Sequence, residues 1–120
     1  MSKRDFILKE IFDYSFLRTN TTPFDKFWCK SLNHFQFVML LGSSEEESLG
    51  YTYEDICGLY PHKHASRTTI HAILNEGVEK GFFVKKINPT DRRKLHYKLT
   101  SEQKKQVMSW LDKHPIRNIE

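Results

Sequence analysis

The sequence predicts a mainly α-helical fold with one small β-hairpin. Apolar residues recur at spacings of three to five through most of the chain, as expected for helices with one buried face. The exception is residues 82–99, where two short strand-like runs flank Asn88-Pro89-Thr90-Asp91, a segment of turn-forming residues. With 120 residues, 38% of them hydrophobic, the chain has the length and composition of one domain with one core.

Three helices are expected in the first third of the chain. Apolar residues at helical spacing predict the first over residues 4–18. The second follows Thr22-Pro23, a cap and a proline at the first helical position, and covers residues 24–30. Asn33 is in a capping-box pattern, which predicts that it caps the third helix, through residue 41.

Two further helices lie close together in sequence after a polar loop over residues 42–50. Thr52 is expected to cap a short helix that Pro61 ends. The next helix covers residues 66–80, and Gly81 follows it in the position where a left-handed backbone favours glycine.

The predicted strands 82–87 and 94–99 follow at once, and a last helix starts at Thr100 and ends before Pro115. A helix-turn-helix followed by a hairpin is the plan of a winged helix-turn-helix DNA-binding domain, here with additional N- and C-terminal helices. The expected division is an N-terminal helical and dimerisation region over 1–31, the winged helix over 32–99 and the C-terminal helix over 100–120.

The charge distribution favours a polyanionic partner for the second half of the chain. Residues 1–60 carry six Lys and Arg against nine Asp and Glu, whereas residues 61–120 carry thirteen against six. Between Lys80 and Lys98 there are seven basic residues and one acidic residue, a bias that a hairpin does not need for solubility. A basic face that only contacts solvent is the alternative interpretation.

The face of the 66–80 helix opposite its apolar stripe suits the major groove of DNA. Its N-terminal half is short, uncharged or basic, whereas Glu76 and Glu79 in the other half are expected to point away from DNA. The wing over 82–99 would reach the minor groove or the backbone. The candidate DNA-binding residues are Ser66, Arg67, Thr68, Thr69, His71, Asn75, Lys85, Lys86, Asp91, Arg92, Arg93 and Lys94.

Residues 91–100, DRRKLHYKLT, resemble the wing signature of the MarR transcriptional regulators, with only Tyr97 departing from it. Residues 65–70 and 79–84 resemble that family's recognition-helix start and its helix-to-strand junction, and the resemblance covers about residues 32–111. It implies that Arg93 enters the minor groove while Asp91 orients it, and that the first turns of the 66–80 helix meet the major groove.

Two positions differ from the pattern of this family. Ala72 stands where the family often has an arginine, and Gly77 where it usually has a core leucine. Since glycine weakens a helix by about 1 kcal/mol relative to alanine, we expect Gly77 to allow close packing against a neighbouring helix.

A homodimer is expected, because a two-fold pair places two recognition helices about 34 to 36 Å apart on DNA. Residues 4–18 and 101–113 are its predicted interface, with Trp110 partly exposed at the edge of an apolar stripe. Aromatic side chains also cluster over residues 24–37, and they predict core or dimer interface. The family resemblance also allows a small aromatic effector bound between the helices.

Other functions have weaker support in the sequence. We expect no enzyme and no cofactor, since there is no glycine-rich phosphate loop or nucleophile elbow. His62, His64, His71 and Cys57 could supply metal ligands, but their spacing matches no finger pattern. The alternative function is a winged helix that contacts protein or RNA, or a replication-associated accessory factor.

The chain is expected to be cytoplasmic, without membrane contact. It contains no apolar run of about 18 residues and no signal-peptide core. Cys29 and Cys57 form no CxxC pair, which predicts two buried thiols in a reducing compartment.

Overall fold

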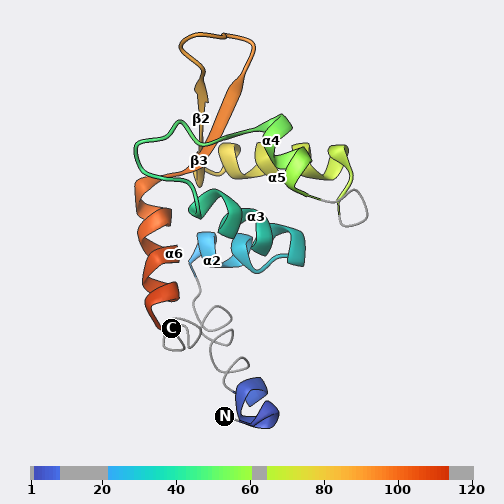
Figure 1. Cartoon of the computed structure of the whole chain (residues 1–120), viewed down its shortest axis with the longest axis vertical. Helices are drawn as coiled ribbons and strands as arrows, with labels where there is room; N and C mark the ends of the chain where they lie inside the picture. The colour runs from blue at the N-terminus through green and yellow to red at the C-terminus, as the bar shows by residue number, and fades with distance from the viewer. Residues whose placement is uncertain (1, 9–21, 61–64, 114–120) are drawn as a thin grey trace.

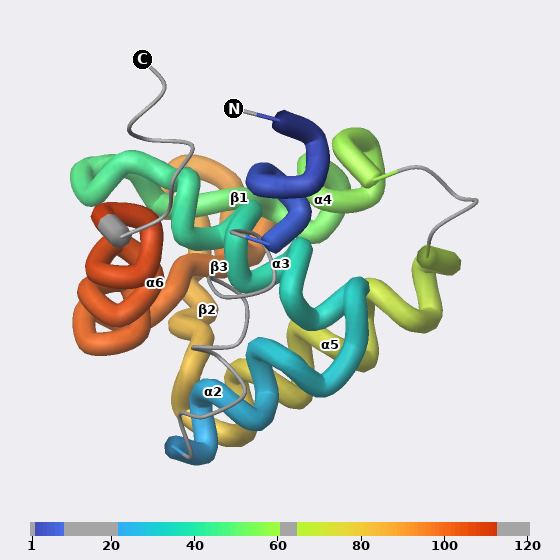
Figure 2. The backbone as a smooth tube through the Cα atoms, turned by 90° about the horizontal axis from the view of Figure 1, so that it is seen from below, coloured from blue at the N-terminus to red at the C-terminus, as the bar shows by residue number. Residues whose placement is uncertain are grey.

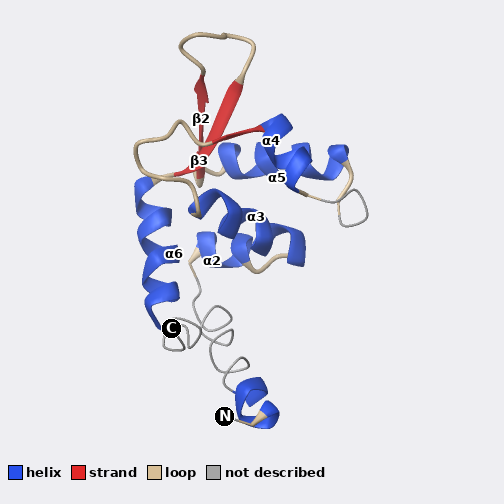
Figure 3. Ribbon diagram, in the orientation of Figure 1, coloured by secondary structure: helices blue, strands red, loops and turns tan. Residues whose placement is uncertain are grey.

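The computed structural model describes residues 2–8, 22–60 and 65–113, and there the chain is mainly helical with a small antiparallel sheet, as predicted (Figure 1, Figure 3). Residues 3–8 are helical, while the rest of the predicted first helix lies outside the described residues. The other elements are, in order, α2 (Pro23–Trp28), α3 (Leu32–Gly42), β1 (Tyr51–Thr52), α4 (Tyr53–Leu59), α5 (Arg67–Glu79), β2 (Phe83–Ile87), β3 (Leu95–Leu99) and α6 (Ser101–Lys113).

Side-chain caps set most of the helix starts where the sequence predicts them. The hydroxyl of Thr22 accepts the Asp25 N–H at the start of α2. At α4, Thr52 forms a capping box with Asp55. At α5, the Ser66 hydroxyl accepts the Thr69 N–H.

The predicted cap of α3 was wrong. Ser31 is the N-cap, because its hydroxyl accepts the His34 N–H and the helix therefore begins at Leu32. Asn33 lies inside the first turn, where its side-chain oxygen accepts a hydrogen bond from the Tyr60 hydroxyl at 3.2 Å. Ser31 and Asn33 are both of residue types that can cap a helix. The contact that engages Asn33 comes from Tyr60, which is distant in sequence, so the sequence pattern does not reveal it.

The sheet has the order β1-β3-β2 and is antiparallel throughout. The predicted hairpin forms β2 and β3, whereas β1 was not predicted. Tyr51 and Thr52 pair with Tyr97 and His96, and two residues are too few to show strand periodicity. Gly50 approaches the backbone of β3 so closely, with φ at 98°, that a Cβ there would lie 2.3 Å from the Tyr97 carbonyl oxygen.

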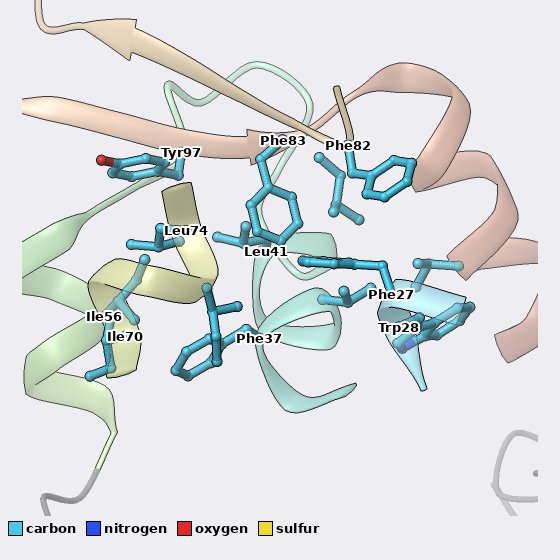
Figure 4. Close-up of a cluster of buried hydrophobic side chains, with 14 of the residues drawn as sticks. Phe27, Trp28, Phe37, Leu41, Ile56, Ile70, Leu74, Phe82, Phe83 and Tyr97 are labelled. Atoms are coloured by element: carbon cyan, nitrogen blue, oxygen red, sulfur yellow. The ribbon is translucent and has the colours of Figure 1, made fainter. Parts of the chain in front are cut away.

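The core lies between the sheet and helices α2, α3, α4, α5 and α6 (Figure 2, Figure 4). Phe27 and Phe37 are buried, as the aromatic run over residues 24–37 predicted for a core. Trp110 corrects another expectation, because it is only 4% exposed and packs edge-on against Trp28, with ring centroids 5.7 Å apart. It therefore belongs to the core of this chain, since α2 covers the edge of the α6 stripe.

Gly77 does allow a close approach, but to a strand and not to a helix. A Cβ at Gly77 would lie 2.1 Å from a ring carbon of Phe83 in β2. The ring of Phe83 thus occupies the space that a side chain on α5 would need, which explains a glycine in the middle of this helix.

A polar cluster joins α2, α3 and α5 at the edge of the core. The Glu76 carboxylate of α5 accepts hydrogen bonds from the ammonium groups of Lys30 and Lys80, each at 2.8 Å, and lies 2.9 Å from Nε2 of His34. The other ring nitrogen of His34 lies 2.6 Å from the Ser31 hydroxyl. Partial burial raises the pKa of the Glu76 carboxyl, but these hydrogen bonds outweigh it and lower the pKa to about 2. Glu76 thus points toward α2 and α3, away from the exposed face of α5.

The cysteine prediction was half right. Cys57 is buried in the core, whereas Cys29 is exposed just after α2, where the helix end leaves it uncovered. In the described ranges, no helix is long and apolar enough to cross a membrane.

Candidate nucleic-acid interface

The β2–β3 hairpin projects away from the helices, at the top of the molecule in Figure 1. Lys85 and Lys86 lie exposed on β2, opposite Tyr97 and His96 of β3. Their exposure follows from strand ends that extend beyond the core, since the burial of β2 falls from Phe83 outward. The two lysines of β2 are therefore open to solvent.

The tip of the hairpin holds Asp91 and Arg93 in contact, as the family resemblance implies. Oδ1 of Asp91 accepts hydrogen bonds from the Arg93 backbone N–H at 3.1 Å and from its Nε at 3.2 Å. These two bonds lower the pKa of the Asp91 carboxyl. The Arg93 side chain is 92% exposed, so the contact directs the guanidinium without burying it. Arg92 and Lys94 on either side of Arg93 are also exposed.

The outward face of α5 is polar, and it is exposed as predicted. Thr68, His71, Ala72 and Asn75 are exposed, while Ile70, Ile73 and Leu74 on the other side are buried. Ser66 is occupied as the N-cap of α5, and Thr69 is half-buried beside it with its hydroxyl 3.1 Å from that of Ser66. The exposed residues of this face line a shallow hollow of about 580 Å³ together with Tyr53.

Arg67 is less available than the sequence suggested. Its guanidinium lies 3.1 Å from the Glu54 carboxylate and 5.9 Å from the centre of the Tyr53 ring. The bond to Glu54 raises the pKa of Arg67 above its usual range. The Tyr53 hydroxyl also donates to the Arg67 carbonyl oxygen at 3.2 Å. An ion pair at the start of α5 thus neutralises one of the predicted phosphate-binding charges.

A second cleft brings the helix and the hairpin together. It encloses about 410 Å³, and its lining includes His71 from α5, Arg93 and Lys94 from the hairpin tip, and Tyr97 from β3. Tyr53, Glu54 and Asp55 form its α4 wall. The residues lining these two clefts include neither Lys85 nor Lys86.

Sequence reasoning missed the contribution of α4 to this surface. Tyr53, Glu54 and Asp55 follow the Thr52 cap, so the pattern showed them only as the first turn of a short helix. These three residues could have indicated an ion pair with the basic start of α5. Their distance from Arg67, however, depends on how α4 packs on α5.

The described residues contain no group of three or more His, Cys, Asp and Glu side chains placed to hold a metal ion. His62 and His64 lie outside them, and His71 is instead packed edge-on against the Tyr53 ring, with centroids 5.5 Å apart.

Comparison of the chain with family models, curated proteins and solved structures gave no match. The resemblance to the MarR regulators therefore rests on the residues quoted above.

Proposed function

We propose that this protein is a sequence-specific, double-stranded DNA-binding transcriptional regulator with a MarR-like winged helix-turn-helix. α5 would enter the major groove, and the β2–β3 hairpin would contact the minor groove or the backbone alongside. The observation that carries this proposal is the shared cleft, because His71 of α5 and Arg93 of the hairpin tip line one space and can reach the same duplex.

The dimensions and chemistry of α5 fit this role. A helix with its side chains is about 10–12 Å across, and the major groove is about 12 Å wide. The exposed side chains in the first two turns are short and uncharged at Thr68 and Ala72, which leaves room for close approach to base edges. The buried stripe on the opposite side holds the helix on the core.

The ion pair at Arg67 bears on whether α5 or the β2–β3 hairpin makes most of the phosphate contacts. A phosphate can bind Arg67 only in competition with Glu54, and Arg93 is likewise paired with Asp91. The Arg93 side chain is however 92% exposed against 52% for Arg67, and Arg92 and Lys94 beside it are exposed too. We therefore assign more of the phosphate contacts to the wing than to the first turn of α5.

A protein-binding winged helix is the second candidate, and one observation favours it. Glu54 and Asp55 line the same cleft as Arg93 and Lys94. Mixed charges of this kind would repel a phosphate on one side and suit a partner protein that carries both signs.

The homodimer is part of the proposal, but with a revised interface. Because Trp110 is buried within the protomer, α6 offers Met108, which is 37% exposed, as its large apolar contact. The helical residues 3–8 offer more, since Phe6, Ile7 and Leu8 are all exposed there. We therefore place the main contact at the N-terminal segment.

Binding of a labelled duplex pool at two salt concentrations tests the proposal. Five or six phosphate contacts would lower the affinity by roughly 10³-fold between about 50 and 200 mM salt. Arg93→Ala should weaken binding and flatten this dependence without lowering the melting temperature, since an exposed wing-tip side chain adds little to the core.

Lys105→Ala is the matched control, because it removes one exposed positive charge from α6, which does not line the cleft. If Arg93→Ala and Lys105→Ala lowered the DNA affinity equally, binding would depend on net charge alone and not on the hairpin tip. An affinity that does not change with salt would overturn DNA binding and favour the protein-binding candidate.

A further inference from the structure

His96 of β3 connects the hairpin tip to the loop before β1. Its Nδ1 lies 3.0 Å from the Gly50 carbonyl oxygen, and its Nε2 lies 3.0 Å from Nδ2 of Asn88, the first residue after β2. The ring is half-buried, and the two partners are 38 residues apart in sequence. This histidine therefore ties the turn of the hairpin, through Asn88, to the loop before β1.

The two partners determine which ring nitrogen carries the proton. A carbonyl oxygen can only accept, so Nδ1 of His96 must donate to Gly50. An amide nitrogen can only donate, so Nε2 must accept from Asn88. Only the neutral ring, protonated at Nδ1, satisfies both contacts, and an imidazolium would set two donors against each other 3.0 Å apart.

Asn88 cannot turn its amide around without loss. Its Oδ1 accepts hydrogen bonds from the Thr90 N–H at 2.9 Å, the Thr90 hydroxyl at 2.8 Å and the Asp91 N–H at 3.0 Å. These three bonds form the turn that carries Asp91 and Arg93. An inverted amide would offer its oxygen to the imidazolium, but the turn would then lose its acceptor.

We propose that His96 is a positioning residue that holds the hairpin tip in its DNA-binding geometry when neutral and loosens it when protonated. The inference rests on the proposed function only for its consequence, which is weaker DNA binding in mild acid. Histidine in general is the side chain whose ordinary pKa lies nearest neutral pH, so the test compares pH 7.5 with pH 5.5.

The charged groups around His96 are mainly basic. Lys86 lies opposite it on β2, Lys94 comes just before β3, and Lys98 lies on β3. The ammonium of Lys98 binds the backbone carbonyl of Glu46 in the preceding loop, and β1 contributes the uncharged Thr52, whose N–H binds Asp55. In the described part of the chain, neither hydrogen-bond partner of the His96 ring is a carboxylate that could replace the bond to Asn88.

His96→Gln and Asn88→Asp test the inference in opposite directions. Glutamine can donate to Gly50 and accept from Asn88 but does not titrate, so the variant should keep its tip ordered at pH 5.5. Aspartate at position 88 still accepts from Thr90 and Asp91, and it accepts from an imidazolium, so its tip should become more ordered as the pH falls.

The first readout needs no DNA. Amide hydrogen exchange at Thr90 and Asp91, followed by NMR from pH 7.5 to 5.5, should show lost protection beyond the intrinsic pH effect in the wild type, none in His96→Gln and gained protection in Asn88→Asp. Unchanged protection in the wild type, or the same loss in His96→Gln, would overturn the inference whether or not DNA binds.

The second readout is the affinity for the duplex selected at pH 7.5. The ratio of wild-type to His96→Gln affinity should fall about three- to tenfold between pH 7.5 and 5.5, because about one hydrogen bond is lost. No DNA binding by any variant, with the exchange pattern intact, would refute the proposed function and leave the switch standing.

Discussion

Replacing Gly77 by alanine should destabilise the protein, although alanine is the better helix former. Within an ordinary helix the change gains about 1 kcal/mol. Here the new Cβ would lie 2.1, 2.3 and 2.6 Å from three ring carbons of Phe83, well inside van der Waals contact. That ring is 3% exposed and packs edge-on against Phe27, with centroids 5.5 Å apart, so it cannot move aside freely. Overpacking costs about 1–3 kcal/mol or more, and at so short a distance we expect a net loss of about 2 kcal/mol.

Gly58→Ala is the matched control, because this glycine also lies in a helix but has no atoms within 4 Å of the added Cβ. Urea unfolding should show a gain of about 0.5–1 kcal/mol for Gly58→Ala and the loss for Gly77→Ala. The double variant Gly77→Ala, Phe83→Leu should lose less stability than the sum of the two single changes, since the smaller side chain at position 83 makes room for the new Cβ. If Gly77→Ala stabilised the protein as much as Gly58→Ala does, the packing of α5 on β2 described above would be wrong.

Three further predictions follow from the cluster at Glu76, the face of α5 and the N-terminal helix. The Glu76 carboxyl has a pKa of about 2 when folded and an ordinary value of 4.5, so its stabilisation is complete above pH 4.5 and is lost as the pH falls toward 2. Because the lysines are half-exposed, solvent screening leaves these ion pairs a contribution of about 1–2 kcal/mol to the free energy of unfolding. Urea unfolding of Glu76→Gln should show this loss at pH 7 but not near pH 2. An equal loss at both pH values would exclude ionic pairing as the cause. In binding-site selection Thr68→Ala should change the preferred sequence more than Asn75→Ala, which lies two turns along α5, and the reverse order would contradict the proposed register. Deleting residues 1–19 should give a monomer by light scattering that binds a palindromic duplex far more weakly, whereas a truncated protein that remains dimeric would exclude the N-terminal interface.

Several features could be predicted because they depend on neighbours in sequence. A cap satisfies backbone N–H groups two or three residues away, so Thr22 and Thr52 marked the starts of α2 and α4 correctly, and the predicted start of α5 at residue 66 lies at its N-cap. Apolar spacing likewise identified the buried stripe of α5, and the run of basic residues identified an exposed hairpin. For the candidate site, the sequence thus determined which side chains are polar and outward on each element.

The tertiary structure decided what those elements meet. Trp110 is buried because α2 covers it, and β1 exists because β3 offers it an edge. The charge of Arg67 is paired because α4 brings Glu54 within 3.1 Å. The link from Gly50 through His96 to the hairpin turn likewise joins residues 46 positions apart. Periodicity and capping report the local free energy of one segment, whereas each of these contacts depends on the distance between segments, which is set only when the whole core packs.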